Sequence, residues 1–353
     1  MTKKSDEIDT KFIDRALSNI DKKYGKGSVF ILDSNERLQN VEVIPTGSYS
    51  LNKALGVGGL PKGRIVEIMG EPGVGKSSLA LQVVAEAQKL NLICVYIDVE
   101  NAMDVKYAKS IGVQTDKLLF SQPNFAEEAI DIAEELIQTN QIGVVVIDSV
   151  AALIPKSELE GEIEDNTVAL QARFMSKALR RLSSIVSKSG TVCIFVNQLR
   201  DLIGVTWGKK SDSPGGKALK FYSSVRIEVI RIGSVKIGDN IIGNKIKAKV
   251  VKNKVAAPFK EAEFNLIFGK GIDSLTEIIN AAISKGVIAQ SGAWFSFNEE
   301  RLGQGKEAVK DFLNNNPILI NEIIEKTNSI DGEITNIIEE GGEVDEGKFE
   351  FKS

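Results

Sequence analysis

The sequence predicts an α/β fold in which a mostly parallel central sheet is flanked by helices. From Arg64 onward, short apolar runs typical of buried strands alternate with amphipathic stretches of helical periodicity. Parallel strands need long crossover connections, and helices in those connections cover the faces of the sheet. The runs are RIVEIMG, LICVYID, KLLFSQ, GVVVIDS and TVCIFVNQ. Three later runs, SVRIEVIRIG, NKIKAKVVKN and EAEFNLIF, are joined by short turns, so we expect the sheet to end in antiparallel strands.

The chain is expected to have four parts. Apolar residues at helical spacing near the N-terminus, followed by the basic KKYGKGSVF, indicate a helical arm and linker over residues 1–37 that serves oligomerisation. Its apolar stripe must dock either on the main domain or on a neighbouring subunit. The core then spans 38–272, and a small α+β domain spans 273–330. The Gly- and Glu-rich residues 331–353 are expected to form a disordered acidic tail.

The composition excludes several classes of protein. The 353 residues contain no histidine, which rules out Ser-His-Asp and Cys-His catalytic sites and His-ligated zinc. The two cysteines, Cys94 and Cys193, lie in apolar runs and are expected to be buried strand residues. No apolar stretch approaches the ~18 residues of a membrane span, and the N-terminus has no apolar signal core. We therefore expect a cytoplasmic protein without a membrane partner.

The net charge is unevenly distributed. The 44 basic and 48 acidic residues give a net charge of −4, which argues against a histone-like DNA binder. Residues 331–353, however, contain eight acidic and two basic residues, or −6, which leaves 42 basic and 40 acidic residues, or +2, in residues 1–330. The folded part is therefore expected to be mildly cationic, with an acidic tail that competes with DNA for the same cations.

The strongest motif is GEPGVGKS, which follows a predicted strand and opens a predicted helix, as a P-loop does. In such a loop, backbone N–H groups cradle phosphate oxygens and the lysine reaches the β/γ-phosphates, while the serine hydroxyl ligates Mg²⁺. The motif therefore predicts binding of ATP with Mg²⁺. Its residues are Gly70, Glu71, Pro72, Gly73, Val74, Gly75, Lys76 and Ser77.

Acidic and amide residues end the neighbouring strands. Asp148 ends GVVVIDS, where its carboxylate either holds Mg²⁺ directly or through water, or caps the next turn. Asp98 and Glu100 lie at the end of LICVYID, and spacing alone does not decide which of them activates water and which is a salt-bridge partner. Gln198 ends TVCIFVNQ, where its amide could contact the γ-phosphate and report its presence to the following segment.

Two features suggest nucleic-acid contacts. The segment 202–216 combines glycines, lysines and Trp207, a composition suited to phosphate and base contacts but equally compatible with a surface loop. Arg173, Arg180 and Arg181 lie at near-helical spacing, and they either line a phosphate path or solvate a helix face.

Together these segments resemble the bacterial RecA recombinase family, from the GKGS linker to the end of the small C-terminal domain. The resemblance is carried by GRIVEIMGEPGVGKSSLAL, YIDVENAMD, LLFSQP, VVVIDSVAALIPKSELEGEIED, IFVNQLR, PGGKALKFYSSVR, VVKNKVAAPFKEAEF and GAWFSF. It implies an ATP-gated filament on single-stranded DNA that pairs with a homologous duplex and exchanges strands in recombinational repair. It also implies a co-protease role in the SOS response, in which the filament promotes self-cleavage of a LexA-like repressor.

The resemblance further implies roles for individual residues. Phosphate binding extends to Ser78, and Lys76 is counted among the catalytic residues. Glu100, rather than Asp98, activates water, and Gln198 senses the γ-phosphate. Other implied contacts are Asp104 and Tyr107 with the adenine, Lys252 and Lys254 with the ATP of the neighbouring subunit, Phe221 at the subunit interface, and Phe268 in place of a tyrosine near the nucleotide.

The family's two DNA-binding loops correspond to residues 161–168 and 199–215. The residues implied to contact DNA are Gly161, Glu162, Ile163, Asn166, Arg173, Arg180, Leu199, Arg200, Gly204, Val205, Trp207, Gly215 and Gly216. Several other positions depart from the family pattern. Asn101 stands where a histidine commonly follows the catalytic glutamate, and in the first loop Glu164 replaces a usual glycine and Val168 a usual methionine. In the second loop Asp201 and Leu202 replace a Met-Lys pair, which removes one cation near DNA.

Two other functions remain open at this point. One is a hexameric DNA motor with the same core fold, which would lack the N-terminal arm and the two loop segments. The other is a nucleotide-gated scaffold whose main output is a surface presented to a repressor. ATP hydrolysis measured with and without single-stranded DNA, alongside strand exchange, distinguishes these functions from a recombinase.

Overall fold

The computed structural model describes residues 11–26, 28–29, 41–161, 170–201, 211–212 and 215–339. The chain divides into two compact units, Met1–Glu42 and Val43–Ser353. The first unit contains helix α1 (Lys11–Tyr24), which confirms the helix expected from the apolar spacing. Its last turn carries Lys22 and Lys23, where basic side chains interact favourably with the helix dipole.

A nine-stranded sheet forms the centre of the second unit, in the order β13-β12-β11-β10-β3-β7-β6-β4-β5. Every pairing from β10 to β5 is parallel, whereas β10–β11, β11–β12 and β12–β13 are antiparallel. This confirms a mostly parallel sheet that ends in antiparallel strands. The strands are β3 (Ile65–Gly70), β4 (Ile93–Asp98), β5 (Leu118–Ser121), β6 (Ile142–Asp148), β7 (Val192–Gln198), β10 (Val225–Ile237), β11 (Asn240–Asn253), β12 (Glu261–Ile267) and β13 (Gly271–Ile272).

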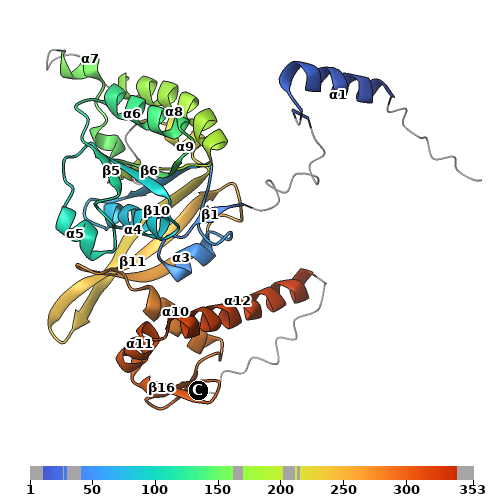
Figure 1. The fold of residues 1–353 in the computed structure, drawn as a ribbon. Helices are drawn as coiled ribbons and strands as arrows, with labels where there is room; N and C mark the ends of the chain where they lie inside the picture. Colours follow the sequence, from blue (N-terminus) through green and yellow to red (C-terminus); the bar gives the residue numbers. More distant parts are fainter. Residues whose placement is uncertain are drawn as a thin grey trace, which may run out of the picture. The chain divides into compact units, whose positions relative to one another are not determined.

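Helices cover both faces of this sheet (Figure 1). Successive residues of a strand point to opposite faces, so Val144 and Val146 pack in one core while Val145 and Ile147 pack in the other. The first core includes α3 (Tyr49–Ala54), α4 (Lys76–Lys89) and α5 (Val105–Ser110), and the second includes α6 (Ala126–Gln138), α8 (Leu170–Ser189) and α9 (Ala218–Tyr222). Shorter elements are β1 (Val43–Ile44), β2 (Leu60–Pro61), η2 (Val150–Ala152), α7 (Lys156–Leu159), β8 (Arg200–Asp201) and β9 (Ser211–Asp212).

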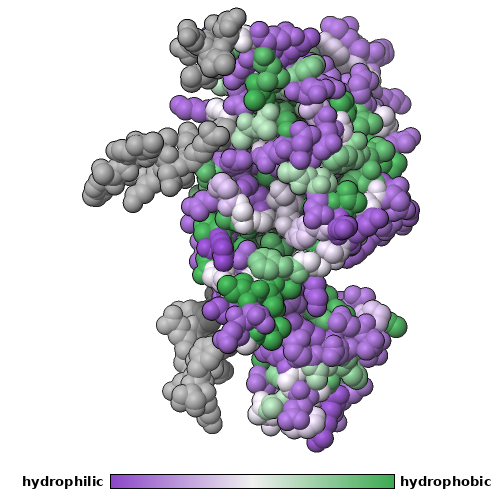
Figure 2. All heavy atoms as spheres, turned by 90° about the vertical axis from the view of Figure 1, so that its left-hand side faces the viewer, coloured by the Kyte–Doolittle hydropathy of each residue, from purple (hydrophilic) through white to green (hydrophobic). Residues whose placement is uncertain are grey.

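The long β10–β11 hairpin projects beyond the rest of the sheet (Figure 1). Near its free end Ile237 and Ile241 are exposed. Figure 2 shows apolar side chains gathered in separate patches among hydrophilic ones, with one patch at the height of this hairpin. None of the helices in the described part of the chain combines the length and apolar character that a membrane-spanning helix needs.

A small α+β domain with its own core follows the sheet, as the sequence predicted. Its elements are α10 (Ser274–Ser284), β14 (Ala289–Ser291), β15 (Trp294–Phe297), β16 (Glu300–Gln304), α11 (Lys306–Asn314) and α12 (Pro317–Glu339). The expectation of a disordered tail from Asp331 is wrong for the first part of that segment, because α12 continues through Glu339. The rest of the predicted tail lies outside the described residues.

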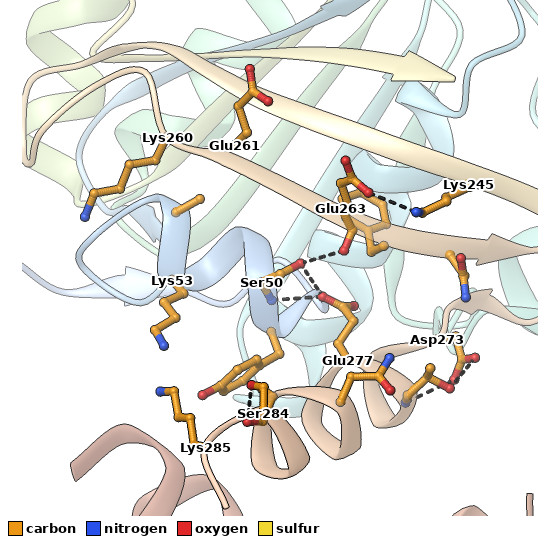
Figure 3. Close-up of a pocket in the computed structure, with 17 residues that line it drawn as sticks. Ser50, Lys53, Lys245, Lys260, Glu261, Glu263, Asp273, Glu277, Ser284 and Lys285 are labelled. Carbon is orange, nitrogen blue, oxygen red and sulfur yellow. Dashed lines mark hydrogen bonds and ion pairs between the residues drawn. The ribbon is translucent and has the colours of Figure 1, made fainter. Parts of the chain in front are cut away.

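One buried carboxylate joins this domain to the sheet domain. Glu277 extends from α10 toward α3, where its Oε2 accepts a hydrogen bond from the Ser50 backbone N–H at 2.9 Å (Figure 3). The same oxygen accepts from the Ser48 hydroxyl at 2.8 Å. The Ser50 hydroxyl donates to the same oxygen, whereas Oε1 is buried without a hydrogen-bond partner. Burial raises the pKa of Glu277 to about 7, against the opposing effect of these hydrogen bonds.

Candidate functional site: a P-loop and the strand ends around it

The loop between β3 and α4 has the backbone of an anion-binding turn. Gly75, the N-cap of α4, adopts a φ of 99° and offers no side chain to cap the helix, so the first N–H groups of α4 remain available to an anionic ligand. Gly70 ends β3 beside β10, where a Cβ atom would lie 2.4 Å from the Val229 carbonyl oxygen. Gly73 also has positive φ. The sequence GEPGVGKS therefore folds as a glycine-rich loop whose backbone geometry suits an anionic ligand.

Lys76 is the cation of this loop. Its side chain is buried, and its Nζ donates to the Glu71 carbonyl oxygen at 2.7 Å, back across the loop. Burial lowers the pKa of Lys76, while the nearby carboxylates of Asp148 and Glu100 act in the opposite direction. The ammonium group thus lies between the loop and two carboxylates, where it can bind phosphate oxygens.

The oxygen ligands suited to a magnesium ion lie on adjacent elements. Asp148 ends β6, where Tyr96 from β4 donates its hydroxyl to Oδ2 at 2.7 Å and Ser77 also forms a side-chain hydrogen bond. Burial raises the pKa of Asp148, and the two hydrogen bonds oppose that rise. A carboxylate and a hydroxyl next to a phosphate-binding loop are the donors that Mg²⁺ prefers, so these residues fit the ion.

Glu100 is exposed and lies just past the end of β4 at Asp98. Its Oε1 accepts hydrogen bonds from the Ser149 hydroxyl and from Gln198 Nε2, the latter at 3.1 Å. Gln198 ends β7, so two strand ends position one carboxylate oxygen. The structure brings together Glu100 and Gln198, which the sequence placed at the ends of different strands.

Asp98, the alternative to Glu100, has a different environment. Its side chain is buried and accepts hydrogen bonds from the backbone N–H groups of Ala102 (3.3 Å) and Met103 (3.1 Å). Gln122 Nε2 adds a third at 3.2 Å. Asp98 therefore holds the chain that follows β4, and this leaves Glu100 as the carboxylate with access to a ligand.

The next helix, α5, is fixed against the P-loop helix. Asp104 is its N-cap and accepts from the N–H groups of Lys106 (2.8 Å) and Tyr107 (3.1 Å). The Tyr107 hydroxyl donates to Ser78 Oγ at 2.7 Å. Asp104, Tyr107 and Ser78 thus form one contiguous wall beside the loop.

Lys252 lies on β11, and Lys254 directly follows this strand. The hydrogen bonds of the Lys252 side chain are with α9 and not with the P-loop of the same chain. Lys252 Nζ donates to the carbonyl oxygens of Lys220 (2.6 Å) and Phe221 (3.1 Å) at the end of α9. Lys254 is exposed, as is Phe221 at 70%. These residues therefore face a surface and not the nucleotide site that their own chain builds.

The arginines of α8 have two different environments. Arg173 and Arg180 are exposed and, with Lys177, line a shallow cavity of about 460 Å³. Arg181, predicted to belong with them, instead pairs with the buried carboxylate of Glu134 on α6. Arg181, whose side chain is 54% exposed, therefore has an ion-pair partner within its own chain, while Lys177 is a cation of this surface that the sequence analysis did not name.

The ends of the two predicted DNA loops are described, but their interiors are not. Glu162, Ile163, Glu164, Asn166, Gly204, Val205 and Trp207 lie outside the described residues. At the second loop, the Leu199 N–H donates to the Gly70 carbonyl oxygen at 3.0 Å, which ties the start of the loop to the P-loop. At its far end Gly215 and Gly216 have positive φ, and a Cβ at either would lie within 3.0 Å of a neighbouring side chain.

Comparison with known proteins agrees with this architecture. A family model described as the RecA N-terminal domain matches residues 11–273, and one described as the RecA C-terminal domain matches residues 276–329. Protein RecA of Aquifex aeolicus is 52% identical over 339 residues, 96% of this chain and 97% of that protein. Protein RecA of Geobacter sulfurreducens is 51% identical over 322 residues, 91% of this chain and 95% of that protein. The chain therefore belongs to the RecA family of DNA-dependent ATPases, which act in DNA recombination and repair.

Proposed function

We propose that ATP, bound with Mg²⁺ at the P-loop, controls assembly of this chain into a filament on single-stranded DNA, and that the filament pairs DNA with a homologous duplex and exchanges strands. The observation that carries the proposal is the hydrogen bond between Gln198 and Glu100. One residue of this pair is positioned to act on water, and the other begins the segment that leads into the second DNA loop.

The P-loop residues from Gly70 to Ser78 hold the phosphates, with Lys76 on the β/γ-phosphates. Ser77 and Asp148 hold Mg²⁺ directly or through water. When bound, the ion neutralises charge that develops on the phosphate oxygens. The burial of Lys76 and Asp148 supports these roles, because their interaction with bound charge is screened less there than in bulk water.

Glu100 orients and deprotonates the attacking water. The hydroxyl of Ser149 and the amide of Gln198 hold the carboxylate at one oxygen, which leaves the other oxygen for the water. A phosphate oxygen that attracts the Gln198 amide would draw it away from Glu100. Gln198 therefore links the presence of the γ-phosphate to the position of the segment after β7.

DNA lies along the two loops and the arginines of α8. Arg173 and Arg180, together with Lys177, supply phosphate contacts, and Trp207 supplies an aromatic ring on which a base can stack. Glycines at 215 and 216 let the backbone approach its neighbours closely at the end of the second loop.

A neighbouring copy completes the nucleotide site. Lys252 and Lys254 reach the ATP of the adjacent subunit, while Asp104 and Tyr107 contact the adenine of their own. The exposed Phe221 and Phe268 support this arrangement, because large apolar side chains at 70% and 56% exposure favour contact with another protein surface. The arm over residues 1–37 contributes to the same assembly, and the filament presents a surface to a LexA-like repressor in the cytoplasm.

The decisive experiment measures ATP hydrolysis by the purified chain with and without single-stranded DNA, alongside strand exchange between a circular single strand and a linear duplex. We expect DNA to stimulate hydrolysis and exchange to require ATP, with Lys76→Ala inactive in both assays. Hydrolysis that does not respond to DNA would contradict the proposal. Stimulation without strand exchange would instead favour a DNA motor or a repressor scaffold.

A further inference from the structure

A buried carboxylate on the central strand β3 lies between the two ends of the second DNA loop. Glu67 is fully buried, and its Oε1 accepts from Asn197 Nδ2 at 2.9 Å while its Oε2 accepts from Arg226 Nε at 2.5 Å. Asn197 lies on β7 and Arg226 on β10, the two strands that flank β3. A buried charge is costly unless it is paired and hydrogen-bonded, so this arrangement needs all three side chains.

One branch of the cluster leads to the start of the loop. The Asn197 Oδ1 accepts a hydrogen bond from the backbone N–H of Gln198 at 2.9 Å. Glu67 accepts a hydrogen bond from Nδ2 of the same side-chain amide, so it fixes the orientation of Asn197. The fixed Oδ1 in turn holds the backbone N–H of Gln198. The next residue, Leu199, is tied to the Gly70 carbonyl oxygen.

The other branch leads to the last turn of the helix that follows the loop. Arg226 and Lys252 are cross-strand partners in the β10–β11 ladder. Lys252 Nζ donates to the carbonyl oxygens of Lys220 and Phe221 in α9, the helix that follows the loop. The cluster around Glu67 thus reaches both the residue before the loop and the helix after it.

The charges of the cluster depend on one another. Burial lowers the pKa of Lys252, and so do the neighbouring cations Lys254 and Arg226, whereas Glu67 acts to raise it. Glu67 is therefore the counter-charge that favours the protonated form of Lys252. Without it, positive charges would face one another across β10 and β11.

We propose that Glu67 is a positioning residue that fixes both ends of the second DNA loop, through Asn197 at Gln198 and through Arg226 and Lys252 at α9. The inference deepens the proposed function and rests on it, because it assigns the coupling between nucleotide and DNA to a specific buried cluster. Glu67 contacts neither ligand in this scheme.

The test replaces Glu67 by glutamine and measures hydrolysis with and without single-stranded DNA, together with the affinity for a fluorescent ATP analogue. In the absence of DNA, where the P-loop of a single chain holds the nucleotide without Lys252 of a neighbour, Glu67→Gln should bind the analogue with unchanged affinity, since no contact of that P-loop changes. Stimulation by DNA should fall by about 10- to 100-fold, the range expected when reacting groups are displaced by about an ångström. Glu263→Gln removes the same charge from an exposed position of β12 in the same sheet, where Glu263 pairs with Lys245, and should behave as wild type.

The pH profile supplies a readout that a general packing defect would not move. In Glu67→Gln the pKa of Lys252 should fall further, so Lys252 loses its proton at a lower pH. The decline of DNA-stimulated hydrolysis at alkaline pH should therefore begin at a lower pH than in the wild type and in Glu263→Gln. The inference would be overturned if Glu67→Gln were stimulated by DNA as strongly as the wild type and its hydrolysis declined at the same alkaline pH. A wild-type chain without DNA stimulation would instead overturn the proposed function, which keeps the two failures distinct.

Removal of one partner from a buried ion pair can unfold a protein, so a second variant is needed. The double substitution Glu67→Leu with Arg226→Leu removes both charges, and such replacements are often tolerated. We expect this variant to unfold cooperatively near the wild-type temperature, to bind the ATP analogue, and to lose stimulation by DNA as Glu67→Gln does. A folded double variant with full stimulation would show that the cluster serves stability alone.

Discussion

The buried Glu277 predicts that attachment of the C-terminal domain weakens as pH rises. In the folded chain the pKa of Glu277 is raised from 4.5 to about 7, so between these values the folded state binds a proton that the unfolded state has released. The stabilisation is fully present below about pH 4.5 and is lost as pH rises through 7. At 1.36 kcal/mol per pH unit, the shift of about 2.5 units corresponds to ~3 kcal/mol.

Substitution of Glu277 by glutamine removes this titration and keeps an oxygen that accepts from Ser48 and Ser50. Urea unfolding at several values between pH 5 and pH 8, followed by Trp294 fluorescence in a Trp207→Phe background, reports on the C-terminal domain. The variant should gain stability relative to the wild type as pH rises, by an amount of the order of 2–3 kcal/mol between pH 5 and pH 8.

A matched control separates this effect from a general change in charge. Glu307→Gln removes a carboxylate from α11 whose side chain is 85% exposed, and it should leave the pH dependence unchanged. The reasoning would be refuted if the difference in unfolding free energy between Glu277→Gln and the wild type were the same at pH 5 and pH 8.

Three further changes test the site and its surroundings. Glu100→Gln should retain ATP binding and filament formation but slow hydrolysis by roughly 10²–10⁴-fold in a steady-state assay, whereas a normal rate would place the base elsewhere. Arg173→Ala should weaken DNA binding and reduce its salt dependence. Arg181→Ala should lower the melting temperature, because it leaves the buried carboxylate of Glu134 without its ion-pair partner, and should not change the salt dependence of DNA binding. Removal of residues 340–353, which carry five acidic and two basic residues, should tighten duplex DNA binding at low salt and have little effect at high salt, as seen in a titration by fluorescence anisotropy.

Much of the site was predictable because its signals are local. The P-loop is a continuous motif whose glycines and lysine follow a strand and open a helix, and both boundaries lie where the apolar pattern changes. Asp148 and Gln198 end runs of buried β-formers, so the parallel sheet brings them to one edge. Strand ends of a parallel sheet converge without any information about the turns between them.

The choice between Asp98 and Glu100 depended on the turn after β4. The chain folds back so that Ala102 and Met103 donate to Asp98, and this turn leaves no periodic signal in the sequence. The ion-pair partner of Arg181 could not be predicted for a similar reason. Its helical spacing matches that of Arg180, but its partner Glu134 lies on another helix far away in the sequence.

The cluster around Glu67 also could not be predicted from local patterns. Glu67 is a single acidic residue within the apolar run RIVEIMG, and nothing in that run indicates a partner for it. Its partners Asn197 and Arg226 come from segments far away in the sequence. The end of α12 was placed too early because Gly332 and the acidic residues around it are typical of a chain end and not of a helix interior.

The hydrogen-bonded pair of Glu100 and Gln198 is proposed to couple nucleotide to DNA. The most direct test compares the stimulation of ATP hydrolysis by single-stranded DNA in the wild type and in Gln198→Ala, with nucleotide affinity measured in parallel. We predict that the variant still binds ATP through the P-loop and that its hydrolysis no longer responds to DNA. Equal stimulation of the two proteins by DNA would show that this pair does not couple nucleotide to DNA.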